Sequence, residues 1–166
     1  DYNKNKLFEL QKNKNIGKDI SEELKKEAEK HVEAAKKAYD TESKVDFAIS
    51  ECKKAIDLNP YDYNAYHFLG FIGARSDEKI DLRLAIKNYK KAIQINPSDE
   101  NFHKNLSDAY YRIGERDKAI EELRIVHALN PADEMVNALL TYGLVDYSDM
   151  KVFKMTLVYD LRNIIS

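Results

Sequence analysis

The sequence predicts an all-α protein, a solenoid in which antiparallel helix pairs stack side by side. Three observations lead to this fold class. Helix breakers are rare, with three prolines and five glycines among 166 residues, whereas the helix-favouring residues Lys, Glu, Leu, Ile and Ala are abundant. A segment of 13 residues that ends in Asn-Pro occurs three times. Apolar residues within it recur every three or four positions, which is the spacing of a one-sided helix.

The repeated segment spans residues 48–60, 85–97 and 119–131. Each copy begins with Ala-Ile and ends with an aliphatic residue, Asn and Pro. Because a proline disfavours helical geometry in the residue before it, each copy is expected to be a helix that stops at Asn-Pro. The prolines lie at 60, 97 and 131, so the period is near 34 residues. That period is the length of a helix pair.

A second amphipathic stretch lies between successive copies. Before the third copy, apolar residues recur at helical spacing from Phe102 to Ile113, and Gly114 follows. Each unit is therefore expected to contain a first helix, a tight turn, a second helix and a proline stop. Small residues such as Gly70 and Ala85 are expected where two helices approach to about 8–10 Å, with Tyr89 filling the space towards the next pair.

At these positions the chain resembles the tetratricopeptide repeat family. The matching residues are Val32, Ala35, Tyr39, Ala48, Cys52, Ala55 and Pro60 in a loose first repeat, Tyr66, Leu69, Gly70, Ala85, Tyr89, Ala92 and Pro97 in the second, and His103, Leu106, Ser107, Tyr110, Ala119, Leu123, Val126 and Pro131 in the third. The resemblance implies a right-handed superhelical solenoid. It places the repeats at about 29–60, 63–97 and 98–131, followed by a degenerate capping helix pair at 132–166.

Departures from the family pattern lead to further expectations. Lys36 stands where a small residue is usual, so the two helices of repeat one are expected to pack less closely. Three extra residues between 75 and 83 are expected to lengthen the turn or the second helix of repeat two. The last pair, with a first helix at 134–145 and a partner at 148–165, is expected to cap the solenoid.

The two ends of the chain are less regular. Residues 1–18 form an arm rich in Lys and Asn, which is expected either to be disordered or to dock as a short amphipathic helix. Residues 19–166 are expected to form the solenoid domain. Asp19 and Glu22 suggest a capping pair for a helix that runs to about Tyr39.

Composition argues against some classes of partner and leaves the compartment open. The formal net charge of -2 offers no excess positive field for nucleic acid. No apolar run approaches the roughly 20 residues that span a bilayer. The sequence starts at Asp1 and not at Met, so the true start is expected to have been cut away, and any leader or anchor would have gone with it. Similar short bacterial tetratricopeptide proteins are often periplasmic or membrane-tethered, with a cytoplasmic location as the alternative.

Neither a catalytic motif nor a metal site is expected. The sequence lacks a phosphate-binding glycine loop, a nucleophile elbow and a His-Glu-x-x-His pair. His31, His67 and His103 lie 36 residues apart, but the repeats are spaced 37 and 34, which places these side chains on progressively rotated helix faces. Cys52 is expected to be a small core residue. No cofactor is predicted.

In the tetratricopeptide family the first helices line a concave groove that holds a peptide or a helix. The resemblance carries this role to Asn64, His67, Phe68, Phe71, Arg75, Asn101, Lys104, Asn105, Asp108, Tyr111, Arg112, Leu139 and Tyr142. Phe68, Phe71, Tyr111 and Tyr142 would make the middle of the groove aromatic, and exposed aromatic patches usually mark interaction sites. The cap or the arm covering this patch is the alternative.

One subclass of the family clamps the C-terminal carboxylate of heat-shock chaperones with Lys and Asn side chains. Glu33, Lys37 and Phe68 stand where that clamp would need other residues, so chaperone-tail binding is not expected. The leading hypothesis is a non-enzymatic scaffold that binds a protein or peptide in the aromatic groove. A self-associating module, such as a homodimer with its groove filled by a terminal helix, is a second hypothesis. A small-molecule or lipid carrier is a third.

Overall fold

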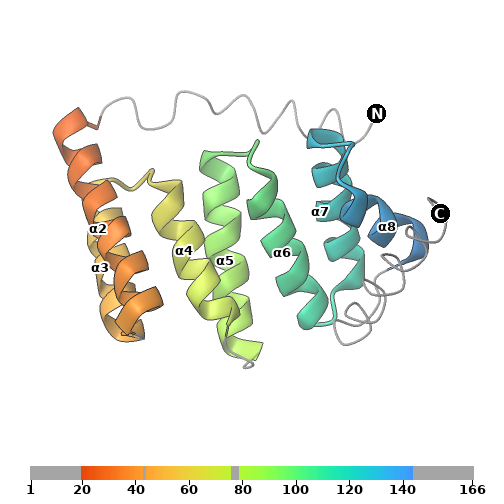
Figure 1. Cartoon of the computed structure of the whole chain (residues 1–166), viewed down its shortest axis with the longest axis horizontal. Helices are drawn as coiled ribbons and strands as arrows, with labels where there is room; N and C mark the ends of the chain where they lie inside the picture. The colour runs from red at the N-terminus through yellow and green to blue at the C-terminus, as the bar shows by residue number, and fades with distance from the viewer. Residues whose placement is uncertain (1–19, 43, 76–78, 144–166) are drawn as a thin grey trace, which may run out of the picture.

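A computed structural model describes residues 20–42, 44–75 and 79–143. The arm at 1–18 and the expected last helix at 148–165 lie outside these residues. The described part is helical and contains no strand: α2 (Glu22–Glu42), α3 (Val45–Leu58), α4 (Tyr63–Ala74), α5 (Lys79–Ile95), α6 (Glu100–Arg112), α7 (Arg116–Leu129) and α8 (Glu134–Tyr142) (Figure 1). None of the helices in these ranges is long and apolar enough to cross a membrane.

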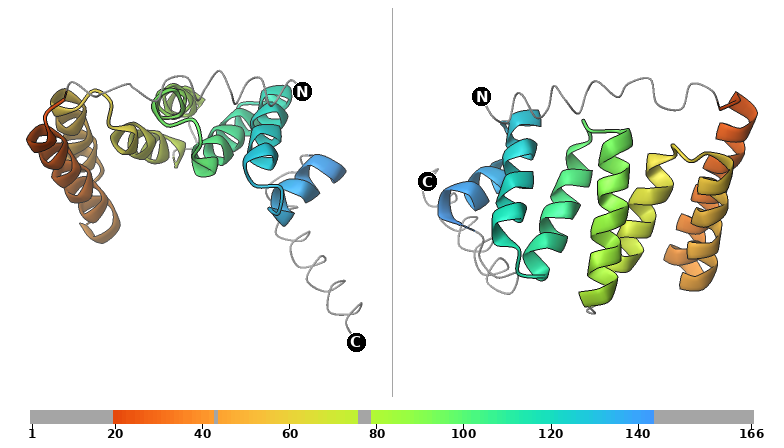
Figure 2. Two further views of the ribbon diagram at one scale, coloured as in Figure 1. Left: turned by 90° about the horizontal axis from the view of Figure 1, so that it is seen from above. Right: turned by 180° about the vertical axis from the view of Figure 1, so that it is seen from behind.

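The helices form antiparallel pairs that stand in a row. Helices α2 and α3, α4 and α5, and α6 and α7 are the pairs, and α8 follows α7 at the end of the row (Figure 1). Seen from above, the row is an arc whose inner side carries α2, α4 and α6, while α3, α5 and α7 form the back (Figure 2). The predicted all-α solenoid of helix pairs is therefore confirmed.

The same short sequence ends one helix and starts the next. Two residues after each Asn-Pro stop comes an aspartate, and its carboxylate accepts a hydrogen bond from a backbone N–H in the first turn that follows. The N···O distances are 3.1 Å for Asp62 with Ala65, 3.0 Å for Asp99 with Asn101 and 3.0 Å for Asp133 with Val136. Aspartate is a strong N-cap residue because it satisfies a backbone donor that the helix leaves unpaired.

The first helix begins differently from the sequence expectation. The Oγ atom of Ser21 accepts a hydrogen bond from the backbone N–H of Leu24 at 3.3 Å, whereas Asp19, the expected cap, lies outside the described residues. Helix α2 runs to Glu42, three residues beyond the expected end at Tyr39. The expected loose packing of repeat one is wrong, because Ala35, Ala48 and Cys52 at the α2–α3 contact are each 0% exposed.

The three extra residues of repeat two lengthen its second helix. Helix α5 has 17 residues, whereas α3 and α7 each have 14. Its buried face carries Leu82, Ala85, Ile86, Tyr89, Ala92 and Ile93. This face and α6 together form the central core of the solenoid. The long helix thus supports both neighbours and leaves its other face on the back of the arc.

Candidate functional site

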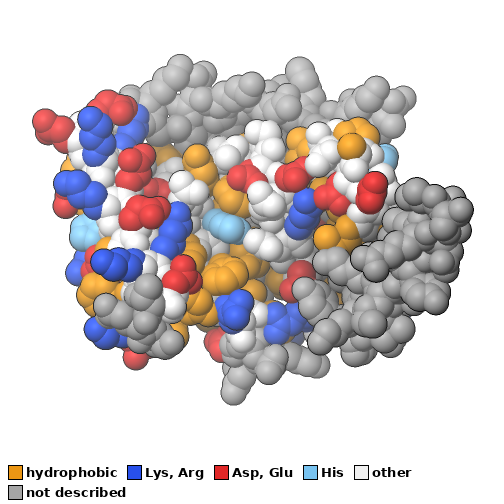
Figure 3. Space-filling view, in the orientation of Figure 1, with side chains coloured by type: hydrophobic (Ala, Val, Ile, Leu, Met, Phe, Trp, Pro, Cys, Tyr) orange, Lys and Arg blue, Asp and Glu red, His pale blue; other side chains and the backbone are white. Residues whose placement is uncertain are grey.

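The candidate site lies on the inner side of the arc, where α4 and α6 contribute most of the predicted groove residues. Figure 3 views this side and shows hydrophobic side chains gathered over the lower part of α4, with charged side chains around them. The helices present these residues because their opposite stripes are buried in the core between first and second helices. The structure then divides the predicted residues into an aromatic part and a polar part.

The aromatic part is a cluster of three rings from two helices. The Phe68 and Phe71 rings of α4 stack with centroids 5.8 Å apart and planes 12° apart. The Tyr39 ring of α2 meets both edge-on, at 5.8 Å from each. Phe68 is only 8% exposed, so its expected place on the open groove surface is wrong. It is instead the floor of the cluster, because α2 packs closely enough to cover it.

Phe71 is the accessible ring of this cluster. It is half-buried, and the guanidinium carbon of Arg75 lies 5.4 Å from its ring centroid. That distance is within the range of a cation–π contact. Arg75 is exposed and forms no ion pair with the other described residues. The cluster therefore presents an apolar ring edge and a positive charge next to each other.

The polar part of the site is connected across the gap between α4 and α6. The amide nitrogen of Asn105 lies 2.7 Å from Nε2 of His67. The His67 ring also packs on the Phe102 ring, with centroids 4.6 Å apart. Burial lowers the pKa of His67, which favours a neutral ring whose Nε2 accepts from the amide. These two predicted groove residues thus hold each other and link repeats two and three.

A second polar connection lies lower on the same face. Arg112 of α6 donates to the backbone carbonyl of Ala74 at the end of α4, and its guanidinium lies 3.9 Å from the Asp108 carboxylate. Burial raises the pKa of Asp108, and the nearby Arg112 lowers it in part. Because Arg112 closes the end of α4, its role within the described residues is to join the two repeats.

Lys104 links α6 to the start of α8. Its Nζ atom lies 2.7 Å from the Asp133 carboxylate and 3.0 Å from that of Glu100. The hydrogen bond to Asp133 is the main cause of a raised pKa for Lys104. Burial works against the charge on Asp133, but the bonds from Lys104 and the helix N–H groups keep the pKa of Asp133 below its ordinary value. The Lys104 charge is thus already paired.

The other predicted groove residues do not join the aromatic cluster. Tyr111 is half-buried against the central core, and the guanidinium carbon of Arg116 lies 5.6 Å from its ring centroid. Leu139 packs on the small core between α7 and α8. Asn64 and Asn101 are exposed at the starts of α4 and α6. The Tyr142 side chain lies outside the described part of the chain.

The three evenly spaced histidines occupy three different environments. His31 Nδ1 lies 2.6 Å from the Glu51 carboxylate, and His67 contacts Asn105 as described above. His103 is 1% exposed, with Nδ1 2.7 Å from Glu122 and Nε2 3.1 Å from the Pro97 carbonyl. Among the described residues no three His, Cys, Asp or Glu side chains are grouped as metal ligands.

Cys52 occupies the expected core position. Its side chain is 0% exposed. Burial raises the pKa of the Cys52 thiol to about 12, so the thiol stays protonated at neutral pH. Because the thiolate is the reactive form of cysteine, this burial argues against a nucleophilic role.

The sequence and the arrangement of the helices were compared with those of known proteins. The family model described as a TPR repeat matches residues 81–114, which cover most of α5 and all of α6. Two solved structures with a similar arrangement of helices are TPR domains. The chain has the tetratricopeptide repeat fold. No curated protein matches it by sequence.

Four solved structures illustrate the similarity. The first TPR of Spaghetti (RPAP3), bound to the HSP90 peptide SRMEEVD, has a TM-score of 0.62 at 20% identity, covering 70% of this chain and 89% of that one. The Arabidopsis OM64 TPR domain has a TM-score of 0.62 at 16% identity, covering 72% and 95%. Two structures of MamA are similar at TM-scores of 0.60 and 0.56, with 26% and 21% identity. The MamA matches cover 68% and 87% of this chain and 64% and 69% of those chains.

Two residues of this tetratricopeptide surface were not among the predicted site residues. Tyr39 belongs to the repeat pattern of the first helix, yet its ring closes the aromatic cluster over Phe68. Asp133 caps α8 and neutralises Lys104. The position of Asp133 two residues after Asn-Pro was a signal for the cap. The ion pair depends on the distance between α6 and α8, which no local pattern reveals.

Proposed function

We propose that this chain is a non-enzymatic protein–protein interaction module that binds a segment of another protein on the inner face of the solenoid. The observation that carries the proposal is the half-buried Phe71 ring, stacked on Phe68 and met edge-on by Tyr39, with the exposed Arg75 charge beside it. An aromatic residue held by its neighbours next to an exposed Arg is the composition of a binding hot spot.

The same geometry suggests what the bound segment carries. An apolar side chain would pack against Phe71, and a neighbouring carboxylate would pair with Arg75, which offers a bidentate fork. Lys104 and Arg112, the two other cations among the predicted groove residues, are engaged within the protein by Asp133 and Ala74. Arg75 is therefore the cation that this proposal assigns to the ligand.

The peptide bound by the Spaghetti domain is an HSP90 peptide, and we propose that this chain has a different ligand. Lys104 and Asn105 are the fragments of the chaperone clamp that it retains. Both are occupied, Lys104 by two carboxylates and Asn105 by His67. A synthetic SRMEEVD peptide is expected not to bind, which a titration can check directly.

The test is affinity capture from the source cell with wild-type protein and with the double variant Phe71→Ala, Tyr111→Ala. The variant is expected to lose the specific partner while keeping its helical circular dichroism. A matched control is Phe47→Ala with Tyr61→Ala, which removes another Phe and Tyr, 49% and 40% exposed, in α3 and in the loop between α3 and α4. The control is expected to capture the partner as the wild type does.

The alternatives give different results in the same set of proteins. Equal capture by the wild type and the double groove variant would contradict the proposed site. If light scattering shows a dimer that the groove variant abolishes, the groove binds a second copy. A lipid found by native mass spectrometry in the wild type and absent from the groove variant would indicate a carrier.

A further inference from the structure

The back of the solenoid carries a second surface that the inner groove does not use. Helix α5 contains five basic residues and a single acidic one, Asp81, which is a net charge of +4. By the same count of Lys and Arg against Asp and Glu, every other described helix is neutral or negative. Although the whole chain has a formal net charge of -2, α5 is thus the described helix that carries net positive charge.

Most of the basic side chains of α5 point away from the core. Helix α5 buries one stripe in the central core, and Arg83, Lys87, Lys90 and Gln94 are exposed on the other, at steps of four, three and four residues. Leu84, beside the same stripe, is 53% exposed. Because α5 is a back helix (Figure 2), this surface is separate from the Phe71 cluster.

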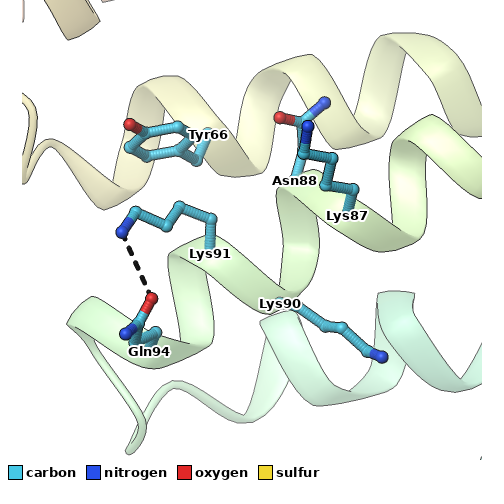
Figure 4. Close-up of a pocket in the computed structure, with 6 residues that line it drawn as sticks. All are labelled: Tyr66, Lys87, Asn88, Lys90, Lys91 and Gln94. Carbon is cyan, nitrogen blue, oxygen red and sulfur yellow. Dashed lines mark hydrogen bonds between the residues drawn. The ribbon is translucent and has the colours of Figure 1, made fainter.

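The surface is hollowed where α5 meets α4. A hollow of about 530 Å³ is lined by Tyr66, Lys87, Asn88, Lys90, Lys91 and Gln94. Its volume falls within the range of about 300–1,000 Å³ typical of binding pockets. Figure 4 shows Tyr66 extending from α4 above Lys91, with Lys87 and Asn88 further along α5. None of the lining side chains is acidic.

The lining groups are hydrogen-bond donors that the described residues leave largely unused. Lys91 donates to the Gln94 side-chain oxygen at 3.2 Å, and the Lys90 ammonium lies 5.4 Å from the Tyr110 ring centroid. Lys87, Lys90 and Lys91 form no ion pair with the other described residues. Burial raises the pKa of Tyr66, so its hydroxyl keeps its proton and can donate.

We infer that this hollow is a second docking site, which takes an acidic segment of a partner protein with its Asp and Glu carboxylates between Tyr66, Lys87 and Lys91. The two lysines are four residues, about 6 Å of helical rise, apart, which suits two carboxylates on adjacent turns of a partner helix. The exposed Leu84 offers an apolar contact to the same helix. The site goes beyond the proposed function because it lies on other residues.

Charge complementarity favours a protein segment over the other anionic partners. Nucleic acid binding requires many neutralised phosphates along an extended basic face, and here the basic face is a single helix on a chain at -2. A membrane surface would be met by several basic and apolar side chains in one plane. The lysines here instead border a hollow with amide and phenol donors.

The test measures binding of a fluorescent peptide of repeating Glu-Glu-Ala-Ala to the full chain by anisotropy, at low and moderate salt. The same peptide with Gln in place of Glu reports the role of charge. The double variant Lys87→Glu, Lys91→Glu is expected to weaken binding of the acidic peptide at least tenfold. A matched control, Lys26→Glu with Lys53→Glu, makes the same change in net charge at two exposed lysines on α2 and α3 and is expected to bind almost as tightly as the wild type.

Each other outcome would overturn the inference. Equal losses in the two charge variants would mean that the peptide responds only to overall charge. Equal binding of the Gln peptide would remove the acidic requirement. Binding of vesicles containing phosphatidylserine, lost with Lys87→Glu, Lys91→Glu while peptide binding is absent, would assign the surface to a membrane. A dimer that this variant dissociates would assign it to a second copy.

The groove variant distinguishes the second docking site from the proposed groove site. Phe71→Ala with Tyr111→Ala is expected to bind the acidic peptide as the wild type does, because neither residue lines the hollow. If that variant also lost the peptide, the binding site would lie in the groove and the second site would be rejected. Circular dichroism of every variant confirms that the helices are intact.

Discussion

Gly70 lies directly against the ring of Tyr89. A Cβ atom added to Gly70 would be 2.6 Å from the Cδ1 and Cε1 atoms of that ring, which is closer than side chains can approach. Tyr89 is 1% exposed and belongs to the central core. The close approach of α4 and α5 therefore depends on a glycine in one helix and a large ring in the other.

Repeat three makes the equivalent contact between its two helices with a different pair of residues. Ser107 and Leu123 occupy the equivalent positions of repeat three, where the Ser107 hydroxyl donates to the Ala119 carbonyl at 2.9 Å. Gly70→Ser is expected to destabilise the protein by about 1–3 kcal/mol through overpacking. Combining it with Tyr89→Leu, the repeat-three pair, should cost less than the two separate losses added together. A double-mutant cycle in urea measures this coupling, and additive losses would contradict the contact.

His103 and Glu122 form a buried pair that should be costly to break. The Pro97 carbonyl can only accept, so His103 Nε2 donates to it, while Nδ1 faces the Glu122 carboxylate at 2.7 Å. Glu122→Ala leaves Nδ1 without its partner in the core and is expected to cost about 1–3 kcal/mol. Arg124→Ala, at an exposed position of the same helix, is the control. Chemical denaturation should show a lower midpoint for the first variant alone.

Asp133 is expected to contribute twice, as a helix cap and as the partner of Lys104. Asp133→Asn keeps an oxygen for the cap and removes the charge, whereas Asp133→Ala removes both. The alanine variant should lose about 1–2 kcal/mol, the usual range for a cap, and the asparagine variant less. The loss in the asparagine variant should shrink in high salt, because it reports the partly exposed ion pair. The loss in the alanine variant should shrink by a similar amount and keep the contribution of the cap. Equal losses for the two variants would mean that the cap contributes nothing.

The stability contribution of Asp108 should depend on pH. Burial raises its pKa above the ordinary value of 3.8, so the folded state disfavours the ionised carboxylate. This cost is fully present above the folded-state pKa and fades as the pH falls towards 3.8. Asp108→Asn is therefore expected to raise the Tm at pH 7, and only slightly, because the Asp108 side chain is 39% exposed and solvent screens its charge.

The advantage of Asp108→Asn should disappear near pH 4. Asp117→Asn, at an exposed position in α7, is the control and should leave the Tm unchanged across the same range. Thermal unfolding of the three proteins between pH 4 and pH 7 provides the comparison. If Asp108→Asn lowered the Tm at pH 7, the contact with Arg112 would outweigh the cost of burial.

The architecture could be predicted from the sequence because its determinants are local and periodic. An Asn-Pro stop followed two residues later by Asp ends one helix and begins the next, whatever the rest of the chain does. Ala85, Gly70 and Tyr89 indicated where the helices pack, because small and large residues alternate at fixed spacing. Helix α5 is longer than α3 and α7, which is one of the two outcomes expected from the three extra residues of repeat two. Cys52 is in the core as predicted.

The site was predicted in part. The register of the first helices placed Phe71, Arg75, His67 and Asn105 on one face, and the structure brings them together in two pairs. Phe68 was expected on the surface because helical register specifies direction but not what covers a side chain. Tyr39, from a helix about 30 residues earlier in the sequence, covers it.

The sequence by itself determined that this protein is a row of helix pairs, that its second helices stop at Asn-Pro, and which faces of the helices are apolar. Those properties depend on contacts between residues a few positions apart. Only the tertiary structure decided which groove residues are free to bind. Lys104 and Arg112 looked available until α8 and the end of α4 brought Asp133 and a backbone carbonyl against them. The basic hollow exists for the same reason, because its volume depends on how far Tyr66 of α4 stands from the lysines of α5.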